Sequence, residues 1–258
     1  MIAQNPEKTD NKRFPLIDSV RGLCVAGMVV YHALFDVVEL FGLDVGRFVS
    51  FVPLMFVRDI GAALFIFVSG VCFRFSHHRL RRFLILFGGG LIVDIVTFAV
   101  APDTAVLFGI LTFMSVSGLL LYALDGILSH LPPKTFFVLN LLLFLFFFRM
   151  NYAYIGTYSH VLFYLPLSFY KNYFTAFFGF PFDGFSSGDY FPLLPWMFVC
   201  LAGYFFFNAV KENKKVVRAA LFGIPVFGHL GRYSLIIYAV HQPVLYGIIR
   251  LIAELCGK

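Results

Sequence analysis

The stretch LIDSVRGLCVAGMVVYHALFDVVELFGL, residues 16–43, decides the fold. It is long and apolar enough to predict a membrane-spanning helix, which needs about 20 such residues. Among its ionisable side chains are Asp18, Arg21, His32 and Asp36. On a helix turning about 100° per residue they share an arc of roughly 60°. Since charges inside a membrane are costly and mark functional sites, we interpret the stripe as a reactive channel. A structural polar seam between helices is the alternative.

The composition extends this interpretation to the whole chain. Of 258 residues, 60% are hydrophobic, 36 are Phe and only 13% are charged, and the mean hydropathy is +0.86. Soluble domains carry about 25% charged residues. The sequence therefore predicts an all-α integral membrane protein. The net charge of +6 comes from basic residues in short loops, which indicates membrane orientation and not nucleic-acid binding.

Apolar runs predict about seven transmembrane helices in one bundle, with six or eight as alternatives. The predicted spans are residues 16–43, 52–75, 83–100, 105–124, 136–148, 191–208 and 233–252. The long aromatic connection, residues 149–190, could contain a re-entrant or half-length helix near 160–170. An interfacial stretch is predicted at 219–230.

Basic loops set the predicted orientation. Lysines and arginines lie in the N-terminal tail, after the second span and after the sixth span. A cytoplasmic N-terminus puts all three loops on the cytoplasmic side. We therefore expect a cytoplasmic tail at residues 1–15 and a multi-pass domain at 16–258 in the cytoplasmic membrane.

Spacing along two spans brings candidate residues to similar depths. His32 lies eleven residues beyond Arg21, or about 16 Å along a helix, and His241 lies about 13 Å beyond Arg232. A cationic inner end suits a phosphorylated donor, and an imidazole deeper in the membrane suits a proton acceptor. Two alternatives stay open: His241 could only bond backbone carbonyls freed by Pro243, and a transporter could use the same groups as a proton relay.

Five phrases, in chain order, together resemble one family. They are IDSVRGL at 17–23 followed by His32 and Asp36, FVSGV at 67–71, FGIL at 108–111, DYFPLLPW at 189–196, and LGRYSL at 230–235 followed by His241 and Gln242. The chain resembles the bacterial branch of the heparan-α-glucosaminide N-acetyltransferase catalytic-domain family. That family is similar, more distantly, to acyltransferase-3 membrane proteins.

The resemblance implies a transmembrane acyltransferase with acetyl-CoA as co-substrate and a sugar-like acceptor on the far side of the membrane. It implies that Arg21 lies near the CoA end and that His32 is the catalytic base. Thr112 stands where family members often carry His, so a member that binds CoA without catalysis is a further hypothesis.

The remaining roles are inferred from chemistry. We expect Asp36 to orient His32, and His241 to contact the thioester region. Arg232, with Arg74 or Arg79, would hold CoA phosphates. The acceptor site would consist of Asp189, Tyr190, Trp196 and Gln242. Direct transfer and an acetyl-histidine route both fit these residues.

The expected partners are the CoA donor, the acceptor and membrane lipids, without nucleic acid. No spacing of histidines with other donors indicates a metal site. The sequence leaves the oligomeric state open, a homodimer included.

Overall fold

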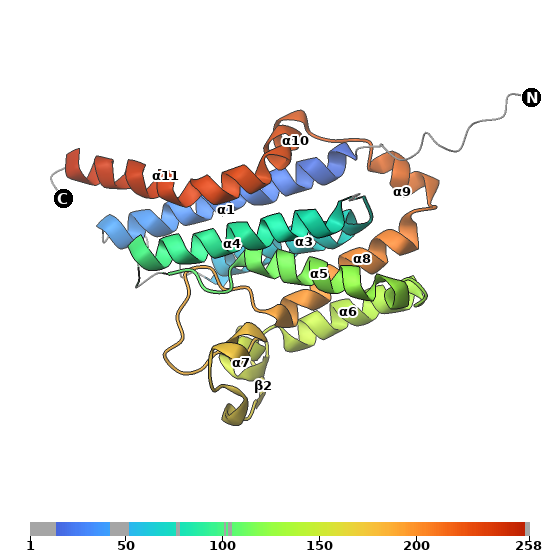
Figure 1. The fold of residues 1–258 in the computed structure, drawn as a ribbon, viewed down its shortest axis with the longest axis horizontal. Helices are drawn as coiled ribbons and strands as arrows, with labels where there is room; N and C mark the ends of the chain where they lie inside the picture. Colours follow the sequence, from blue (N-terminus) through green and yellow to red (C-terminus); the bar gives the residue numbers. More distant parts are fainter. Residues whose placement is uncertain (1–13, 42–51, 76–77, 101, 103–104, 256–258) are drawn as a thin grey trace, which may run out of the picture. The chain divides into compact units, whose positions relative to one another are not determined.

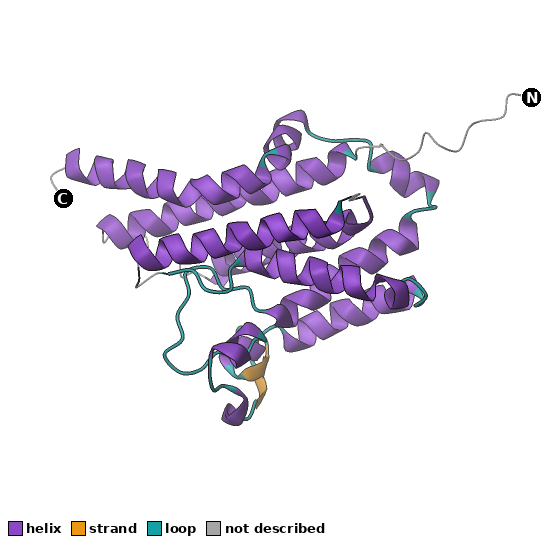
Figure 2. Ribbon diagram, viewed as in Figure 1, coloured by secondary structure: helices purple, strands orange, loops and turns teal. Residues whose placement is uncertain are grey.

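The computed structural model describes residues 14–41, 52–75, 78–100, 102 and 105–255. Within them, seven helices are long and apolar enough to cross a membrane (Figures 1 and 2). These candidate spans correspond to α1 (Pro15–Phe41), α3 (Val52–Cys72), α4 (Arg79–Val100), α5 (Ile110–Leu128), α6 (Pro133–Phe147), α8 (Leu193–Val210) and α11 (Ser234–Leu255), and the span that begins with α6 runs on to Tyr152. The prediction of an all-α, multi-pass membrane protein with about seven spans is confirmed. Residues 1–13 of the predicted tail and 42–43 of the first predicted span lie outside the described residues.

Helix boundaries differ from the apolar runs where local chemistry extends or delays a helix. α4 begins at Arg79, four residues before the predicted span, because arginine side chains at a helix end can reach the interface while the backbone stays helical. α5 begins only at Ile110, after Gly109, whose backbone is extended. α6 begins at Pro133, because proline suits the first helical position.

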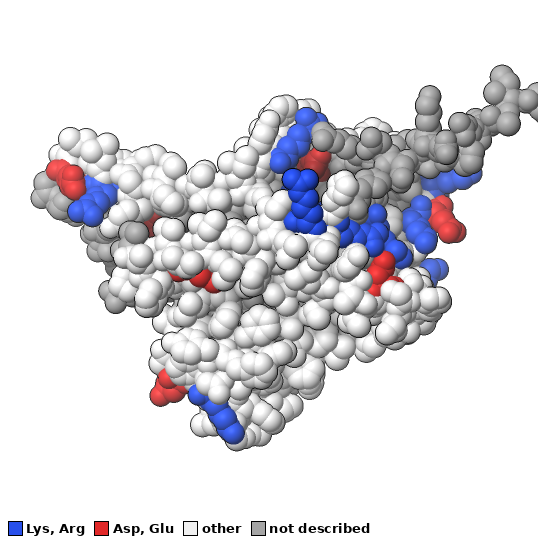
Figure 3. All heavy atoms as spheres, viewed as in Figure 1, with Lys and Arg blue, Asp and Glu red and all other residues white. Residues whose placement is uncertain are grey.

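The chain divides into two compact units, and each is described by itself. The first consists of Met1–Gly46 and Val210–Lys258, which hold α1, α9 (Lys214–Ala219), α10 (Pro225–Arg232) and α11. Figure 3 shows an almost uncharged surface along α11, with charged groups towards its ends. This distribution is expected of a helix whose sides face lipid.

The predicted interfacial stretch at 219–230 is a short connection followed by α10, and α10 packs tightly against α1. A Cβ atom on Gly22 would collide with the backbone carbonyl of Phe227, and one on Gly231 with that of Asp18. The Ser19 hydroxyl, 5% exposed, accepts a hydrogen bond from the Ile224 N–H at 2.8 Å. The glycines in the IDSVRGL and LGRYSL phrases therefore permit this close approach of backbones.

The second unit, Arg47–Ala209, is a group of helices formed by α3, α4, α5, α6 and most of α8. α3 and α8 approach closely, because Gly70 faces the Cys200 carbonyl and Gly203 faces the Phe67 carbonyl. The Ser115 hydroxyl of α5 donates to the Phe83 carbonyl of α4 at 2.7 Å. These contacts position the polar groups of the second unit.

The suggestion of a re-entrant or half-length helix near 160–170 is wrong. The structure has an antiparallel hairpin there, formed by β1 (Tyr154–Gly156) and β2 (Val161–Tyr164). The short helices η4 (Met150–Tyr152), η5 (Leu167–Phe169) and α7 (Tyr173–Phe177) flank it. Gly156 has a φ of 154°, and aromatic and β-branched residues favour strands, so a continuous helix is disfavoured.

Candidate active site

The first unit pairs the two histidines that spacing placed at a similar depth. The His32 ring on α1 lies 5.1 Å, centroid to centroid, from the His241 ring on α11. The His241 Nδ1–H donates to the Tyr238 carbonyl at 2.6 Å. Because a carbonyl only accepts, this bond fixes the proton on Nδ1 in the neutral ring and leaves the lone pair on Nε2. His241 is 9% exposed, so the pair contains a buried, oriented imidazole.

Asp36 and Gln242 form a second link between α1 and α11. The Gln242 Nε2 donates to the Asp36 Oδ1 at 3.0 Å. Asp36 is 7% exposed. This hydrogen bond thus joins Asp36 to the helix that carries His241. Its donor, Gln242, is a residue that the sequence analysis placed in the site for the acceptor substrate. Helical periodicity could not find this pair, because its members lie 206 residues apart.

Arg21 fixes the start of α11 against α1. Its Nη2 donates to the Ser234 Oγ at 2.6 Å, and its Nη1 lies 3.9 Å from Asp18 Oδ1. Ser234 is 1% exposed, while the Arg21 side chain is 26% exposed. A guanidinium has five N–H donors, so these contacts leave it capacity to bind an anion. Arg232, at the end of α10, is exposed.

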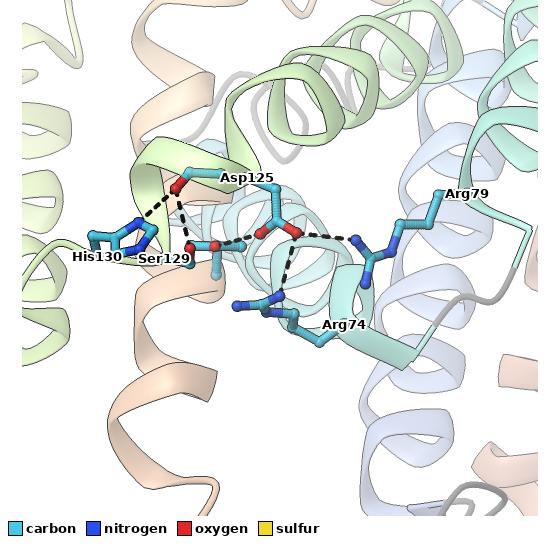
Figure 4. Close-up of polar contacts among 7 residues, drawn as sticks. Arg74, Arg79, Asp125, Ser129 and His130 are labelled. Atoms are coloured by element: carbon cyan, nitrogen blue, oxygen red, sulfur yellow. Dashed lines mark hydrogen bonds and ion pairs between the residues drawn. The ribbon is translucent and has the colours of Figure 1, made fainter.

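In the second unit, Arg74 and Arg79 converge on one carboxylate. Figure 4 shows both guanidinium groups pointing at Asp125, whose Oδ2 lies 3.2 Å from Arg74 and 3.1 Å from Arg79. The Tyr204 hydroxyl donates to the Asp125 Oδ1 at 2.6 Å, and Tyr204 is fully buried. Two arginines facing one aspartate leave a net positive charge, which suits binding of a phosphate.

Sequence reasoning missed Asp125 and Tyr204. The available signal was that Asp125 is an acidic residue near the end of an apolar span. By the predicted orientation, it lies on the same side of the membrane as the basic loop that follows the second span. Its use required knowing that η2 (Phe73–Phe75), which follows α3 and carries Arg74, meets α4, α5 and α8 at this point. The structure supplies that knowledge by bringing these four side chains together.

The predicted acceptor residues of the second unit all have structural partners. Asp189 Oδ2 accepts from the Ile110 N–H at 3.2 Å, and a carboxylate there is favourable beside the N-terminus of α5. The Tyr190 hydroxyl donates to the Ala176 carbonyl at 2.5 Å, and burial raises its pKa. Trp196 is 8% exposed, so it is a core residue and not part of an interfacial belt. Its ring contacts Phe144, Phe148 and Phe191.

Two further buried polar groups lie on α4 and α5. The Asp94 Oδ1 and the Thr112 Oγ1 are buried and have no hydrogen-bond partner among the described residues. A Cβ atom on Gly90 would lie 2.5 Å from the Thr112 Oγ1, so this hydroxyl points at α4, one turn before Asp94. Thr112 thus faces a closely packed helix.

Comparison with known families identifies the family of this chain. A family model described as heparan-alpha-glucosaminide N-acetyltransferase, catalytic, matches residues 13–243. The match includes both histidines, Asp36, Gln242 and the Arg74–Arg79–Asp125 cluster. No curated protein and no solved structure matches the chain.

Proposed function

The chain belongs to the heparan-alpha-glucosaminide N-acetyltransferase catalytic family, and we propose that it acylates a sugar-like acceptor across the membrane. The acyl group, acetyl or another short chain, would come from cytoplasmic acetyl-CoA. The acceptor would present an amine or hydroxyl on the opposite side of the cytoplasmic membrane. Family membership and the seven apolar helices support a membrane-bound N-acetyltransferase. The identities of the donor, the acceptor and the membrane are part of our proposal.

The His32–His241 pair is the observation that carries the proposal. Transfer from a thioester requires a base that removes a proton from the attacking amine or hydroxyl. His32 would be that base, and His241, with its Nδ1 proton fixed on the Tyr238 carbonyl, would contact the thioester region. The Asp36–Gln242 bond would hold α1 and α11 in register so that both rings keep this geometry.

The reaction itself needs little else from the protein. As the acceptor heteroatom attacks the thioester carbonyl carbon, its proton passes to the imidazole. The carbon–sulfur bond then breaks, and CoA leaves as the thiol with a proton returned by the histidine. Direct transfer and an acetyl-histidine route are both compatible with this pair, because each route begins from a neutral imidazole.

Arginines at the basic loops would bind the donor. In the first unit, Arg21 is partly exposed and already oriented by Ser234, and exposed Arg232 lies on the adjoining α10. In the second unit, Arg74 and Arg79 are held together by Asp125. Guanidinium groups pair with phosphate oxygens through two parallel hydrogen bonds, so each set fits a CoA phosphate.

The acceptor site would lie at the start of α8. Asp189, Tyr190 and Trp196 precede or begin α8, on the side opposite the basic loops by the predicted orientation. Their structural bonds favour a role in shaping the acceptor site. Gln242 would act through Asp36 in place of contacting the acceptor directly.

The test is acetyl transfer by the full-length protein in proteoliposomes, combined with calorimetry of acetyl-CoA and dephospho-CoA binding. His32→Ala should lower turnover by about 10²- to 10⁴-fold while leaving donor affinity within a few-fold. His229→Ala is the matched control, because His229 is an exposed histidine on α10 of the same unit.

Each outcome decides a part of the proposal. Unchanged turnover in His32→Ala would remove His32 from the mechanism. Absence of acetyl-CoA binding at millimolar concentration would overturn the acyltransferase proposal, and solute flux dependent on His32 would then support a transporter. Donor binding without transfer to any amine or hydroxyl would indicate a member that has lost catalysis.

A further inference from the structure

The hairpin region of the second unit exposes an unusual amount of apolar surface. Leu162, Tyr164, Leu167 and Phe174 are 71%, 76%, 74% and 71% exposed, and Phe163 is 49% exposed. All four residues of β2 are exposed, so both faces of this strand lack cover within the described residues. We call these five side chains the hairpin patch. Several highly exposed apolar side chains on one short segment mark a region that contacts protein or membrane.

The base of the hairpin is firmly attached to the helices. The Tyr158 hydroxyl donates to the Asp59 carboxylate on α3. The Arg149 guanidinium lies 3.9 Å from the Tyr152 ring centroid and 4.4 Å from that of Tyr158. Ile155 of β1 is 1% exposed. These contacts fix the hairpin, so its apolar side chains are held outward by structure.

The hairpin patch continues a surface that faces lipid. The Phe163 ring lies 6.4 Å, centroid to centroid, from the Phe146 ring of α6. Phe146 is 46% exposed, and Leu142 and Leu145 on the same helix are 58% and 65% exposed. α6 is one of the seven span-length helices, and its outward side chains therefore meet acyl chains. The apolar surface thus passes from the lipid-facing side of α6 onto the hairpin. The hairpin region follows the C-terminal end of α6 in the ribbon (Figure 1).

We propose that the hairpin patch is embedded in the boundary between headgroups and acyl chains, in the leaflet at the C-terminal end of α6. Phenylalanine, leucine and tyrosine are the side chains that this boundary favours, since tyrosine places an apolar ring in lipid and its hydroxyl among headgroups. Exposed Lys171 between η5 and α7 supplies a cation for lipid phosphates. Continuity with α6 favours lipid over a protein partner. The proposal does not depend on acyl transfer.

The experiment measures the depth of tryptophan reporters in phosphatidylcholine nanodiscs that hold one protein each. Leu162→Trp and Phe174→Trp are the reporters, and native Trp196 contributes the same background to every sample. Leu142→Trp on α6 is the control within lipid, and Glu212→Trp, in the exposed turn after α8, is the control in water. Quenchers are lipids with a nitroxide on the headgroup, near it or deep in the chain, and aqueous iodide.

We expect the reporters at 162 and 174 to be quenched most by nitroxides on or near the headgroup. Their iodide quenching should be several-fold weaker than that of the Glu212→Trp control. Iodide quenching equal to that control, without quenching by any spin-labelled lipid, would overturn the proposal. Protection from iodide that arises only when two proteins share a nanodisc would also overturn it, in favour of a contact between copies. Two reporter positions keep the test decisive if one variant fails to fold.

Discussion

The Gln242 side-chain amide donates a hydrogen bond of 3.0 Å to the Asp36 carboxylate, joining α11 to α1 one residue beyond His241. A buried carboxylate needs such a donor, because an unsatisfied polar group inside a protein or membrane is costly. The link explains why an acidic residue and an amide both occur within apolar helices. It also makes the distance between the His32 and His241 rings depend on the Asp36–Gln242 hydrogen bond.

Gln242→Leu should therefore destabilise the protein by about 1–3 kcal/mol, because Asp36 loses its donor while staying buried. Unfolding in detergent by a chemical denaturant measures this free energy. Asp36→Leu combined with Gln242→Leu is the control, since replacing both partners with apolar groups can be nearly neutral. Additive losses in the double variant would show that the two side chains are not coupled.

Arg74→Gln and Arg79→Gln should each weaken acetyl-CoA binding about tenfold, equivalent to about 1.4 kcal/mol, because each removes a guanidinium that we propose binds a CoA phosphate. Calorimetry measures the dissociation constant. Arg81→Gln is the matched control, because Arg81 lies in the same basic segment, is exposed and makes no contact with Asp125 in the structure. Equally weakened acetyl-CoA binding in all three variants would contradict a specific phosphate site, and would indicate only a general attraction of anions to the basic segment.

Gly22→Ala should destabilise the protein by about 1–3 kcal/mol, because the added methyl group meets the Phe227 carbonyl of α10. Thermal unfolding of the purified protein detects the loss. Gly27→Ala, on the same helix, introduces the same methyl group where nothing lies within 4 Å. That variant should be neutral or slightly more stable, since alanine favours helix. Equal losses in both variants would contradict close packing of α1 on α10.

Tyr170 should make stability fall in alkaline solution. Burial raises its pKa from 10.0 to about 12, while its hydroxyl donates to the Met150 carbonyl. Between these two values the folded state keeps a proton that the unfolded state has lost, so the contribution is complete below pH 10 and falls as pH rises towards 12. Tyr170→Phe should flatten this part of the stability curve, measured by unfolding at a series of pH values.

The exposed Tyr164 provides the matched substitution. Tyr164→Phe should leave the alkaline part of the stability curve as it is in the unmodified protein. A Tyr170→Phe curve that overlays that of Tyr164→Phe would exclude Tyr170 as the source of the pH dependence.

Much of the fold could be predicted because it is local. A helix in lipid must satisfy its own backbone hydrogen bonds, so the apolar runs and basic loops suffice to predict seven spans. The similar depth of His32 and His241 also follows from helical rise alone once two spans run in the same direction. The hairpin at 154–164 was mispredicted, because short aromatic runs suit strand and helix alike until distant contacts, such as that of Tyr158 with Asp59, decide between them.

By itself, the sequence determined the all-α membrane class, the approximate spans, the polar stripe on the first helix and, through five phrases, the family. Tertiary structure alone decided that Asp36 bonds to Gln242, that Asp125 and Tyr204 hold Arg74 and Arg79 together, and that Trp196 is a core residue. The physical reason is the range of the interactions. Periodicity and hydropathy act within one helix, whereas a buried hydrogen bond or ion pair depends on which helices pack together and in what register.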